Sequence, residues 1–255
     1  IFNPNFPRAC FSRFNQCQRV VDNTIVALSK VVPELVTAGN SAAIHFCSYA
    51  GFIPEKGEYW LYLEVNEGSY GGRKGRDGMD SVDCLMANTR NNPIEELDMR
   101  FPMRTEQYEL RPESAAPGKW RGGIGIVRVN TFLTDTIVTC EGDRQESDPP
   151  WGIFGGHEGL NGAIVKNAGT EKAEEWPSKV TGWHLEADDF IEIKVPSGGG
   201  YGDPMKRNPE KVAEDVMLGL VSRDAAEKTY GVALTADFKV DAAATARLRT
   251  RVAAE

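Results

Sequence analysis

Apolar residues keep a helical spacing in one segment near the start of the chain. Between residues 15 and 35 they recur at the i, i+3, i+4 and i+7 positions that form one buried helical face. The set is Val20, Val21, Ile25, Leu28, Val31, Val32 and Leu35. The pattern predicts an amphipathic helix that ends near Pro33, because proline cannot continue the helical hydrogen bonding.

The middle of the chain has the composition and alternation of β-strands. The segment 58–66, Glu-Tyr-Trp-Leu-Tyr-Leu-Glu-Val-Asn, is rich in aromatic and branched residues, which predicts a strand covered on much of both faces. In the segment 189–195, Ile191, Ile193 and Val195 alternate with charged residues, as in a half-buried strand. The same reasoning predicts strands at 104–111, 124–133 and 136–141.

Helix-capping residues change the pattern after residue 205. Asn208 before Pro209 is a typical helix start, and a second short helix is expected from Ser222 to a glycine stop at Gly231. The segment 235–255 is either a weakly docked helix or a frayed tail. We therefore predict an α+β fold, with a β-rich central region preceded by one amphipathic helix and followed by short C-terminal helices. The β-rich region is expected over 1–205 and the helical segment, docked on the same domain, over 206–255.

Composition and charge exclude several classes of partner. The 255 residues include 29 lysines and arginines against 37 aspartates and glutamates, a formal net charge of -8. A surface for nucleic acid or for an anionic membrane would therefore have to be local. Charged residues and prolines interrupt the apolar stretches before they reach the roughly 20 residues that cross a bilayer. We expect neither nucleic acid nor a membrane as a partner.

The five cysteines indicate a reducing environment. They are odd in number and contain no C-x-x-C pair, which fits neither a disulfide framework nor a zinc site. We therefore expect a cytoplasmic protein. The sequence begins at Ile1 without methionine or a recognisable leader, so either the chain was cut or the sequence starts inside a longer protein.

The three histidines give little support for a metal site. His45, His157 and His184 do not occur in a metal-ligand spacing, so we expect no metal held by residues of this chain alone. His45 lies among apolar residues and is expected in the core. His157 stands in a glycine-rich loop and is a candidate for acid–base catalysis.

The loop 68–78, Gly-Ser-Tyr-Gly-Gly-Arg-Lys-Gly-Arg-Asp-Gly, holds five glycines and three cations. Gly71 and Gly72 would let the backbone approach a substrate, while Arg73 and Arg76 present planar forks to a carboxylate or phosphate. Asp77 would orient one of these arginines. The alternative is a solvated turn, since the loop matches neither common phosphate-binding template. A second glycine-rich segment, 197–204, is predicted to have a packing role.

Five ordered motifs resemble the C-terminal part of hydantoinase B/oxoprolinase family proteins. They are 18–22 (Gln-Arg-Val-Val-Asp), 67–78, 87–97 (Ala-Asn-Thr-Arg-Asn-Asn-Pro-Ile-Glu-Glu-Leu), 108–111 with 118–125, and the polyglycine stretch in 196–204. The resemblance covers nearly the whole chain up to about Gly231. It implies that Asn88 and Arg90, in the third motif, help to bind the substrate.

The resemblance also implies an activity and a set of partners. In this family an A-type partner binds ATP with Mg and phosphorylates a carbonyl oxygen, and the B-type subunit helps to complete the reaction. We therefore expect part of an ATP-dependent hydrolase acting on a cyclic amide; the alternatives are a ketone carboxylase of the acetone or acetophenone type and a non-catalytic assembly subunit. The chain alone is expected to be inactive and to bear no cofactor.

The expected partners are the A-type subunit, a small carbonyl substrate and the N-terminal portion of the B-type subunit. That portion carries the divalent-metal motifs of the carboxylase relatives and has no counterpart in this sequence. A chain without it should leave apolar surface for a partner, for example around Phe2, Phe6, Phe11 and Phe14.

Overall fold

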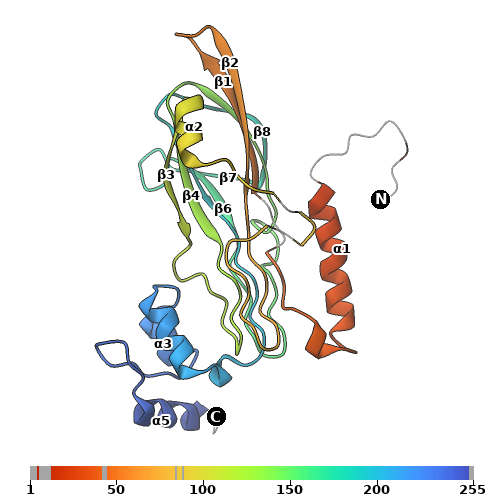
Figure 1. Ribbon diagram of the computed structural model, residues 1–255, viewed down its shortest axis with the longest axis vertical. Coiled ribbons are helices and arrows are strands. Elements are labelled where there is room, and N and C mark those ends of the chain that lie inside the picture. Colours follow the sequence, from red (N-terminus) through yellow and green to blue (C-terminus); the bar gives the residue numbers. More distant parts are fainter. Residues whose placement is uncertain (1–4, 6–12, 42–44, 84, 88, 253–255) are drawn as a thin grey trace.

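Two antiparallel sheets form the body of the protein (Figure 1). The computed structural model describes residues 5, 13–41, 45–83, 85–87 and 89–252. One sheet has the order β2-β1-β5-β8 and the other β3-β4-β9-β6-β7. The strands are β1 (His45–Ile53), β2 (Glu58–Asn66), β3 (Met103–Leu110), β4 (Ile126–Phe132), β5 (Thr136–Glu141), β6 (Ala163–Lys166), β7 (Glu174–Trp176), β8 (Lys179–Leu185) and β9 (Phe190–Lys194).

Helices precede, interrupt and follow the strands along the chain. They are α1 (Arg13–Leu28), the 3-10 helix η1 (Pro33–Leu35), α2 (Ile94–Arg100), the 3-10 helix η2 (Pro204–Lys206), α3 (Pro209–Met217), α4 (Arg223–Lys228) and α5 (Ala242–Val252). Helices α3 and α5 lie beyond the loops that extend from the sheets (Figure 1). The α+β fold, with its N-terminal helix and its short C-terminal helices, is therefore confirmed. Among the described residues, none of the helices has the length and apolar character needed to cross a membrane.

The main core lies between the two sheets. Apolar side chains of β1, β2, β5 and β8 meet those of β3, β4, β6, β7 and β9 in one buried cluster, in which Tyr49, Phe132 and Trp176 are among the largest members. The predicted strands at 58–66 and 136–141 are confirmed with their bounds, and those at 104–111, 124–133 and 189–195 are confirmed within two residues. Strands β1, β6, β7 and β8 and helix α2 were not predicted.

Helix α1 is shorter than its apolar pattern predicted. It ends at Leu28, whose carbonyl accepts hydrogen bonds from the amides of both Val31 and Val32. The Ser29 hydroxyl donates to the Val26 carbonyl over 2.7 Å, and the residue before Pro33 is excluded from helical geometry by the proline ring. The chain therefore leaves the helix before Pro33 and enters η1.

Strand β2 is covered on only one face over most of its length, contrary to the prediction. Trp60 and Tyr62 point into the core, whereas Tyr59 is 88% exposed and Leu61 65% exposed. In the pairing register Leu61 lies beside Ala50 of β1, which lies beside Ile137 of β5, itself half exposed. The outer face of this sheet, defined by Phe52, Tyr59, Leu61, Leu63 and Ile137, is therefore apolar where a solvated sheet face is normally polar.

Two cysteines meet inside the same sheet. Cys47 of β1 pairs directly with Cys140 of β5, and their Sγ atoms are 2.9 Å apart. Burial raises the pKa of the Cys47 thiol well above its ordinary value, so this side chain stays protonated. The spacing of the cysteines in the sequence gave no sign of this pair.

Glycine-bearing loops extend from the sheets in a backbone-packed bundle (Figure 1). The bundle contains the segments 38–41, 69–79, 116–125, 150–162 and 196–202. The central segment donates successive amide hydrogen bonds to three neighbours: Gly198 to the carbonyl of Gly123, Gly199 to that of Gly39, and Gly200 to that of His157. The predicted packing role of the polyglycine stretch is thereby confirmed.

Side chains are excluded from this bundle by distance. A Cβ atom on Gly200 would lie 1.9 Å from the carbonyl oxygen of Pro117, and one on Gly122 would lie 1.9 Å from that of Gly198. Each neighbour is rigid backbone that cannot move aside without breaking its own hydrogen bonds. Glycine is therefore required here for close approach of one chain segment to another.

The C-terminal segment packs around a small second core. Asn208 accepts a hydrogen bond from the amide of Glu210, and Ser222 accepts one from that of Ala225, as expected of the two predicted caps. Gly231 has a φ of +60°, which suits its predicted role as a stop. Helix α5 is docked, because a guanidinium nitrogen of Arg249 donates to the carbonyl of Arg207 over 2.7 Å.

We expect Gly200→Ala to destabilise the protein by about 3 kcal/mol or to prevent folding, because the added Cβ meets backbone. Gly57→Ala is the matched control. Gly57 lies in the β1–β2 turn with a φ of +66°, and no atom lies within 4 Å of the Cβ that the substitution would add. That variant should lose only about 1 kcal/mol from backbone strain. Urea unfolding of both variants measures the difference, and equal losses would contradict the packing argument.

Candidate functional site

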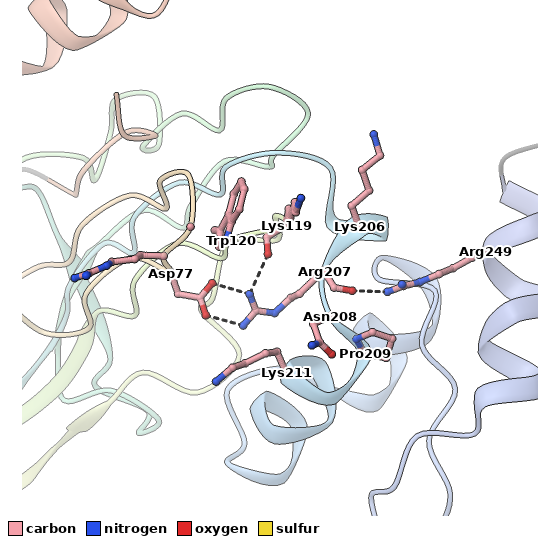
Figure 2. Close-up of a pocket in the computed structure, with 11 residues that line it drawn as sticks. Asp77, Lys119, Trp120, Lys206, Arg207, Asn208, Pro209, Lys211 and Arg249 are labelled. Carbon is pink, nitrogen blue, oxygen red and sulfur yellow. Dashed lines mark hydrogen bonds and ion pairs between the residues drawn. The ribbon is translucent and has the colours of Figure 1, made fainter. Parts of the chain in front are cut away.

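A pocket of about 710 Å³ lies where the glycine loops meet the C-terminal helices (Figure 2). Four segments form its walls: the end of the cationic glycine loop, the turn at 119–120, the start of α3 with the residues before it, and α5. The lining residues are Gly75, Arg76, Asp77, Lys119, Trp120, Lys206, Arg207, Asn208, Pro209, Lys211 and Arg249.

Beneath the pocket, two buried arginines bridge three aspartates. Arg207 forms two parallel hydrogen bonds to Asp77, of 2.6 and 2.9 Å, and also donates to Asp215 of α3. Arg121 binds Asp80 through both terminal nitrogens, at 2.8 and 3.1 Å, and reaches Asp215 through Nε at 3.2 Å. Asp215 is thus shared by both guanidiniums, and this network joins the glycine loops to the C-terminal helices.

The network fixes the charge of Asp77. Burial alone would raise the pKa of this carboxyl, but the hydrogen bonds and charge of Arg207, with the charge of Arg121, hold the pKa below its ordinary value. Asp77 is therefore ionised at neutral pH and committed to Arg207. It also accepts a 2.9 Å hydrogen bond from the backbone amide of Arg121.

The remaining charges around the pocket are mainly positive. The ammonium of Lys119 lies 4.8 Å from the centre of the Trp120 ring, and Arg249 donates to backbone carbonyls. Lys211 pairs with Glu214 at the exposed surface, where such a pair is weak. Because Asp77 is the only carboxylate among the lining residues and is neutralised by Arg207, the pocket is suited to an anionic group such as a carboxylate or phosphate.

The cationic glycine loop contributes only part of its length to this pocket. Arg76 and Asp77 line the pocket, whereas Arg73 is exposed outside it and shares a tight backbone turn with Arg76. Lys74 pairs with Glu34 instead. Asp77 does orient an arginine, but that arginine is Arg207 from far along the sequence, not Arg73 or Arg76.

The other predicted site residues are distributed over the structure. Gly71 and Gly72 are buried in the loop bundle, where a Cβ would lie 2.2 and 2.4 Å from backbone oxygens. His157 is exposed in its loop, and Arg90 lines a different pocket. Asn88 lies outside the described residues. The structure therefore gives the two glycines a packing role and brings Arg76 and Asp77 together at one pocket.

The histidines and acidic residues do not form a metal centre in the described part of the chain. His45 is fully buried, and burial lowers its pKa to about 4, so this core side chain is neutral at physiological pH. Within the described ranges, no three histidine, cysteine, aspartate or glutamate side chains are grouped so that they could hold a metal ion. These residues therefore do not fit a divalent cation.

Sequence reasoning missed most members of the pocket. Arg207 and Asp215 lie eight positions apart, and neither local spacing nor charge marks them as partners of a loop 130 residues earlier. Lys119, Trp120 and Arg121 did have a signal, because they belong to the 118–125 motif, but that motif indicated only a strand entry.

Comparison with known proteins identifies relatives along most of the chain. The family model for hydantoinase B/oxoprolinase matches residues 1–204. The B subunit of a putative D-/L-hydantoinase from Pseudomonas sp. (strain NS671) is 42% identical over 248 residues, which span 97% of this chain and 41% of that protein. The beta subunit of the Pseudomonas jessenii caprolactamase is 30% identical over 89% of this chain and 40% of its own length.

Solved structures share the fold. The ATP-dependent caprolactamase from Pseudomonas jessenii superposes with a TM-score of 0.74 at 25% identity, over 88% of this chain and 40% of that chain. The nucleotide-free structure of an acetone carboxylase gives a TM-score of 0.71 at 20% identity, over 89% and 35%. This chain thus spans less than half the length of the proteins that it matches.

We expect Asp77→Asn to destabilise the protein by about 1–3 kcal/mol at pH 7, because Arg207 loses a buried charged partner. Since the pKa of Asp77 is lowered in the folded state, its stabilising effect is present above the unfolded pKa of about 4 and is lost as pH falls through the folded value. The difference in free energy of unfolding between the parent and the Asp77→Asn variant should therefore become smaller at acidic pH.

Denaturant unfolding of the parent and the variant from about pH 7 to pH 3 measures this effect. Asp224→Asn is the control, because its pair with Lys228 is exposed to solvent on α4 and should contribute little to stability. A deficit that stays constant down to pH 3 would show that the charge of Asp77 does not stabilise the fold.

Proposed function

Since the chain belongs to the hydantoinase B/oxoprolinase family, we propose that it is part of a B-type subunit in an ATP-dependent enzyme that hydrolyses a cyclic amide. An A-type partner would bind ATP with Mg and phosphorylate the carbonyl oxygen, and this chain would help to complete the reaction. The observation that carries the proposal is the positive pocket at Arg76, whose one carboxylate is neutralised by a buried arginine.

The chemistry of such a reaction needs cationic surroundings. Phosphorylation of an amide oxygen places negative charge on the substrate and makes the oxygen a leaving group. Fixed cations near that group stabilise charge as it develops. Arg76, Lys119 and Lys206 would supply this field, while Arg207 holds the pocket wall. No step is assigned to a metal on this chain.

The relatives support the hydrolase reading and keep one alternative open. Caprolactamase is named ATP-dependent and hydantoinase is named for a cyclic amide, and both match about nine tenths of this chain or more. The shared fold with acetone carboxylase favours a ketone carboxylase as the second candidate. A non-catalytic assembly subunit is the third possibility and would need no pocket.

The outer face of the β2-β1-β5-β8 sheet supports an obligate partner. We assign that face to the portion of the B-type polypeptide that lies outside this chain, because the relatives are more than twice as long and would present that portion on the same polypeptide. A long apolar edge strand such as β2 is an aggregation risk unless it is covered. Any divalent metal would belong to that portion.

The function is tested with the chain assembled with an A-type subunit and the rest of the B-type polypeptide. ATP-dependent loss of hydantoin, 5-oxoproline or caprolactam, with release of phosphate, supports the hydrolase. ATP- and bicarbonate-dependent consumption of acetone or acetophenone supports the carboxylase instead. Activity that is unchanged when this chain's pocket is altered supports the assembly role.

In the assembled enzyme, Arg76→Ala should lower turnover by about 10²–10³, because the pocket loses a planar cation near the developing charge. Arg73→Ala is the matched control, since Arg73 belongs to the same turn but lies outside the pocket lining. Arg76→Lys should recover only part of the activity. If both alanine variants keep turnover within a few-fold of the parent, the loop has no part in the reaction.

Leu61→Lys should weaken association with the rest of the B-type polypeptide by tenfold or more, because it places a charge on the apolar outer face. Folding should change little, as Leu61 is exposed. Met99→Lys is the control, because Met99 is also exposed, at 77% against 65% for Leu61, but lies on α2 and is not part of this outer face. Light scattering of the chain alone tests the rival occupant: a stable dimer lost on Leu61→Lys would assign the face to a second copy.

A further inference from the structure

A second pocket, of about 460 Å³, lies at the end of β2. Its walls come from Glu67 after β2, from Ser81 and Asp83, from residues 89–94 and from Tyr108 of β3. Almost every lining side chain is polar, with Glu67, Ser81, Arg90, Asn92 and Tyr108 among them. The volume falls within the range of small-molecule sites. The pocket thus has room for a small polar molecule.

Glu67 is the buried ionisable group of this pocket. Its side chain belongs to a residue that is only 8% exposed, yet it reaches the pocket lining. The hydroxyl of Tyr108 donates to Glu67 Oε2 over 3.4 Å, which is a long hydrogen bond, and the backbone of Glu67 itself also bonds to the carboxyl. A buried carboxyl that reaches a pocket wall is well placed to bind a ligand.

The surroundings hold Tyr108 and Glu67 in place. The guanidinium of Arg128 lies over the Tyr108 ring, 4.8 Å from its centre. Arg128 is itself buried and pairs with Glu64 of β2 over 2.9 Å. The positions of Tyr108 and of the pocket wall therefore depend on the core ion pair between the two sheets.

The environment also shifts the pKa of Glu67. Burial raises the pKa of this carboxyl, and the nearby charge of Asp83 adds to that rise. The backbone hydrogen bond of Glu67 itself, the hydrogen bond from Tyr108 and the charge of Arg128 act in the opposite direction but do not cancel the rise. Asp83 and the exposed Arg90 are the other charged residues that line the pocket.

A carboxylic acid presents a donor and an acceptor side by side, and so does the edge of a cyclic amide. In a ring the amide is held cis, so its N–H and C=O point in the same direction. The two groups can form a pair of hydrogen bonds, with N–H donating to the acid carbonyl and the acid O–H donating to the amide oxygen. A ketone has only the acceptor and cannot form this pair.

We propose that the Glu67 pocket binds the cis-amide edge of a cyclic amide through this paired contact. The substrate class rests on the proposed function, which the assignment deepens by giving the amide a place on this chain. Glu67 is thereby a substrate-binding residue, and Tyr108 positions it. The motifs 67–78 and 87–97, which the cationic pocket does not fully use, meet at this site.

Binding should depend on pH with a defined sign. Below the pKa of Glu67 the neutral acid makes both hydrogen bonds, whereas above it the carboxylate can only accept from the ligand N–H. Loss of one neutral hydrogen bond weakens binding by about two- to tenfold. The affinity should therefore fall as pH rises through that pKa.

The test uses the full chain and a neutral lactam, 2-pyrrolidone, titrated upward from about pH 4.5, the ordinary pKa of a glutamate, to about pH 8.5. Binding is followed by the backbone amide NMR signals of residues 89–92 and of Ile94. The N-methyl derivative of the lactam, which has no N–H, is the ligand control. Glu95→Gln is the protein control, because Glu95 is an exposed neighbour on α2 outside the pocket lining.

Three variants separate the hydrogen-bond pair from a general effect on folding. Glu67→Gln keeps a donor and an acceptor side by side, so it should bind the lactam at all pH values without the pH dependence of the parent. Glu67→Ala should bind tenfold or more weakly. Glu95→Gln should match the parent. Preserved affinity in Glu67→Gln also shows that the pocket is folded.

Equal binding of the N-methyl derivative, retention of pH dependence in Glu67→Gln, or no shift of the amide signals of residues 89–92 and Ile94 would overturn the assignment. These results do not depend on turnover. Lactam binding in an assembled enzyme that lacks ATP-dependent lactam hydrolysis would keep the site and reject the proposed function, while lactam hydrolysis without lactam binding at Glu67 would do the reverse.

Discussion

Direct backbone packing among glycine-bearing loops is the constraint on which both pockets depend. Five segments from distant parts of the chain approach one another so closely that a Cβ atom does not fit at their glycine contacts. Backbone hydrogen bonds between the loops fix their positions, with help from a few short polar side chains such as Asn40 and Ser69. Side chains at the borders of this bundle, including Asp77, Arg121 and Ser81, therefore project from rigid backbone. That rigidity is what a loop-built site needs in order to hold a geometry.

The aspartate–arginine network extends this order to the C-terminal helices. Arg121 belongs to the loop bundle, whereas Asp215 lies on α3 and Arg207 lies just before it. Because these side chains bind one another, a change in one element displaces the others. Each guanidinium has one bidentate aspartate and shares Asp215, which satisfies the buried charges as a unit. The cationic pocket thus exists only when the C-terminal segment is docked, although its cations come from four separate segments of the sequence.

Short-range sequence patterns correctly predicted the helix caps and several strands, because these elements depend on neighbouring residues. The caps at Asn208 and Ser222 and the strands at 58–66 and 136–141 follow from short-range geometry and composition. Strand β1 was missed because Ser48, Ala50 and Gly51 weaken its alternation, and the outer face of β2 was misjudged because apolar residues suit a partner surface as well as a core. Glycines 71 and 72 signalled close approach correctly, but a sequence does not say whether a ligand or another backbone approaches. The Asp77–Arg207 contact spans 130 positions and has no local pattern at all.

The two pockets differ in their polar groups: one is lined mainly by cations, and the other contains the buried carboxyl of Glu67. Asp77 lines one and Ser81 the other, so a single four-residue step of rigid loop separates a positive pocket from a pocket with a buried carboxyl. Ser81 adopts a φ of +42°, a conformation that serine takes only when its surroundings impose it, and its amide is bonded to the Ile124 carbonyl at the edge of the bundle. An anionic group and a neutral amide make opposite demands on their surroundings, since cations that attract the first would hold Glu67 ionised and unable to donate to the second. Separate pockets on one rigid segment meet both demands, and that arrangement suits a substrate which is neutral when it binds and charged once its oxygen is phosphorylated.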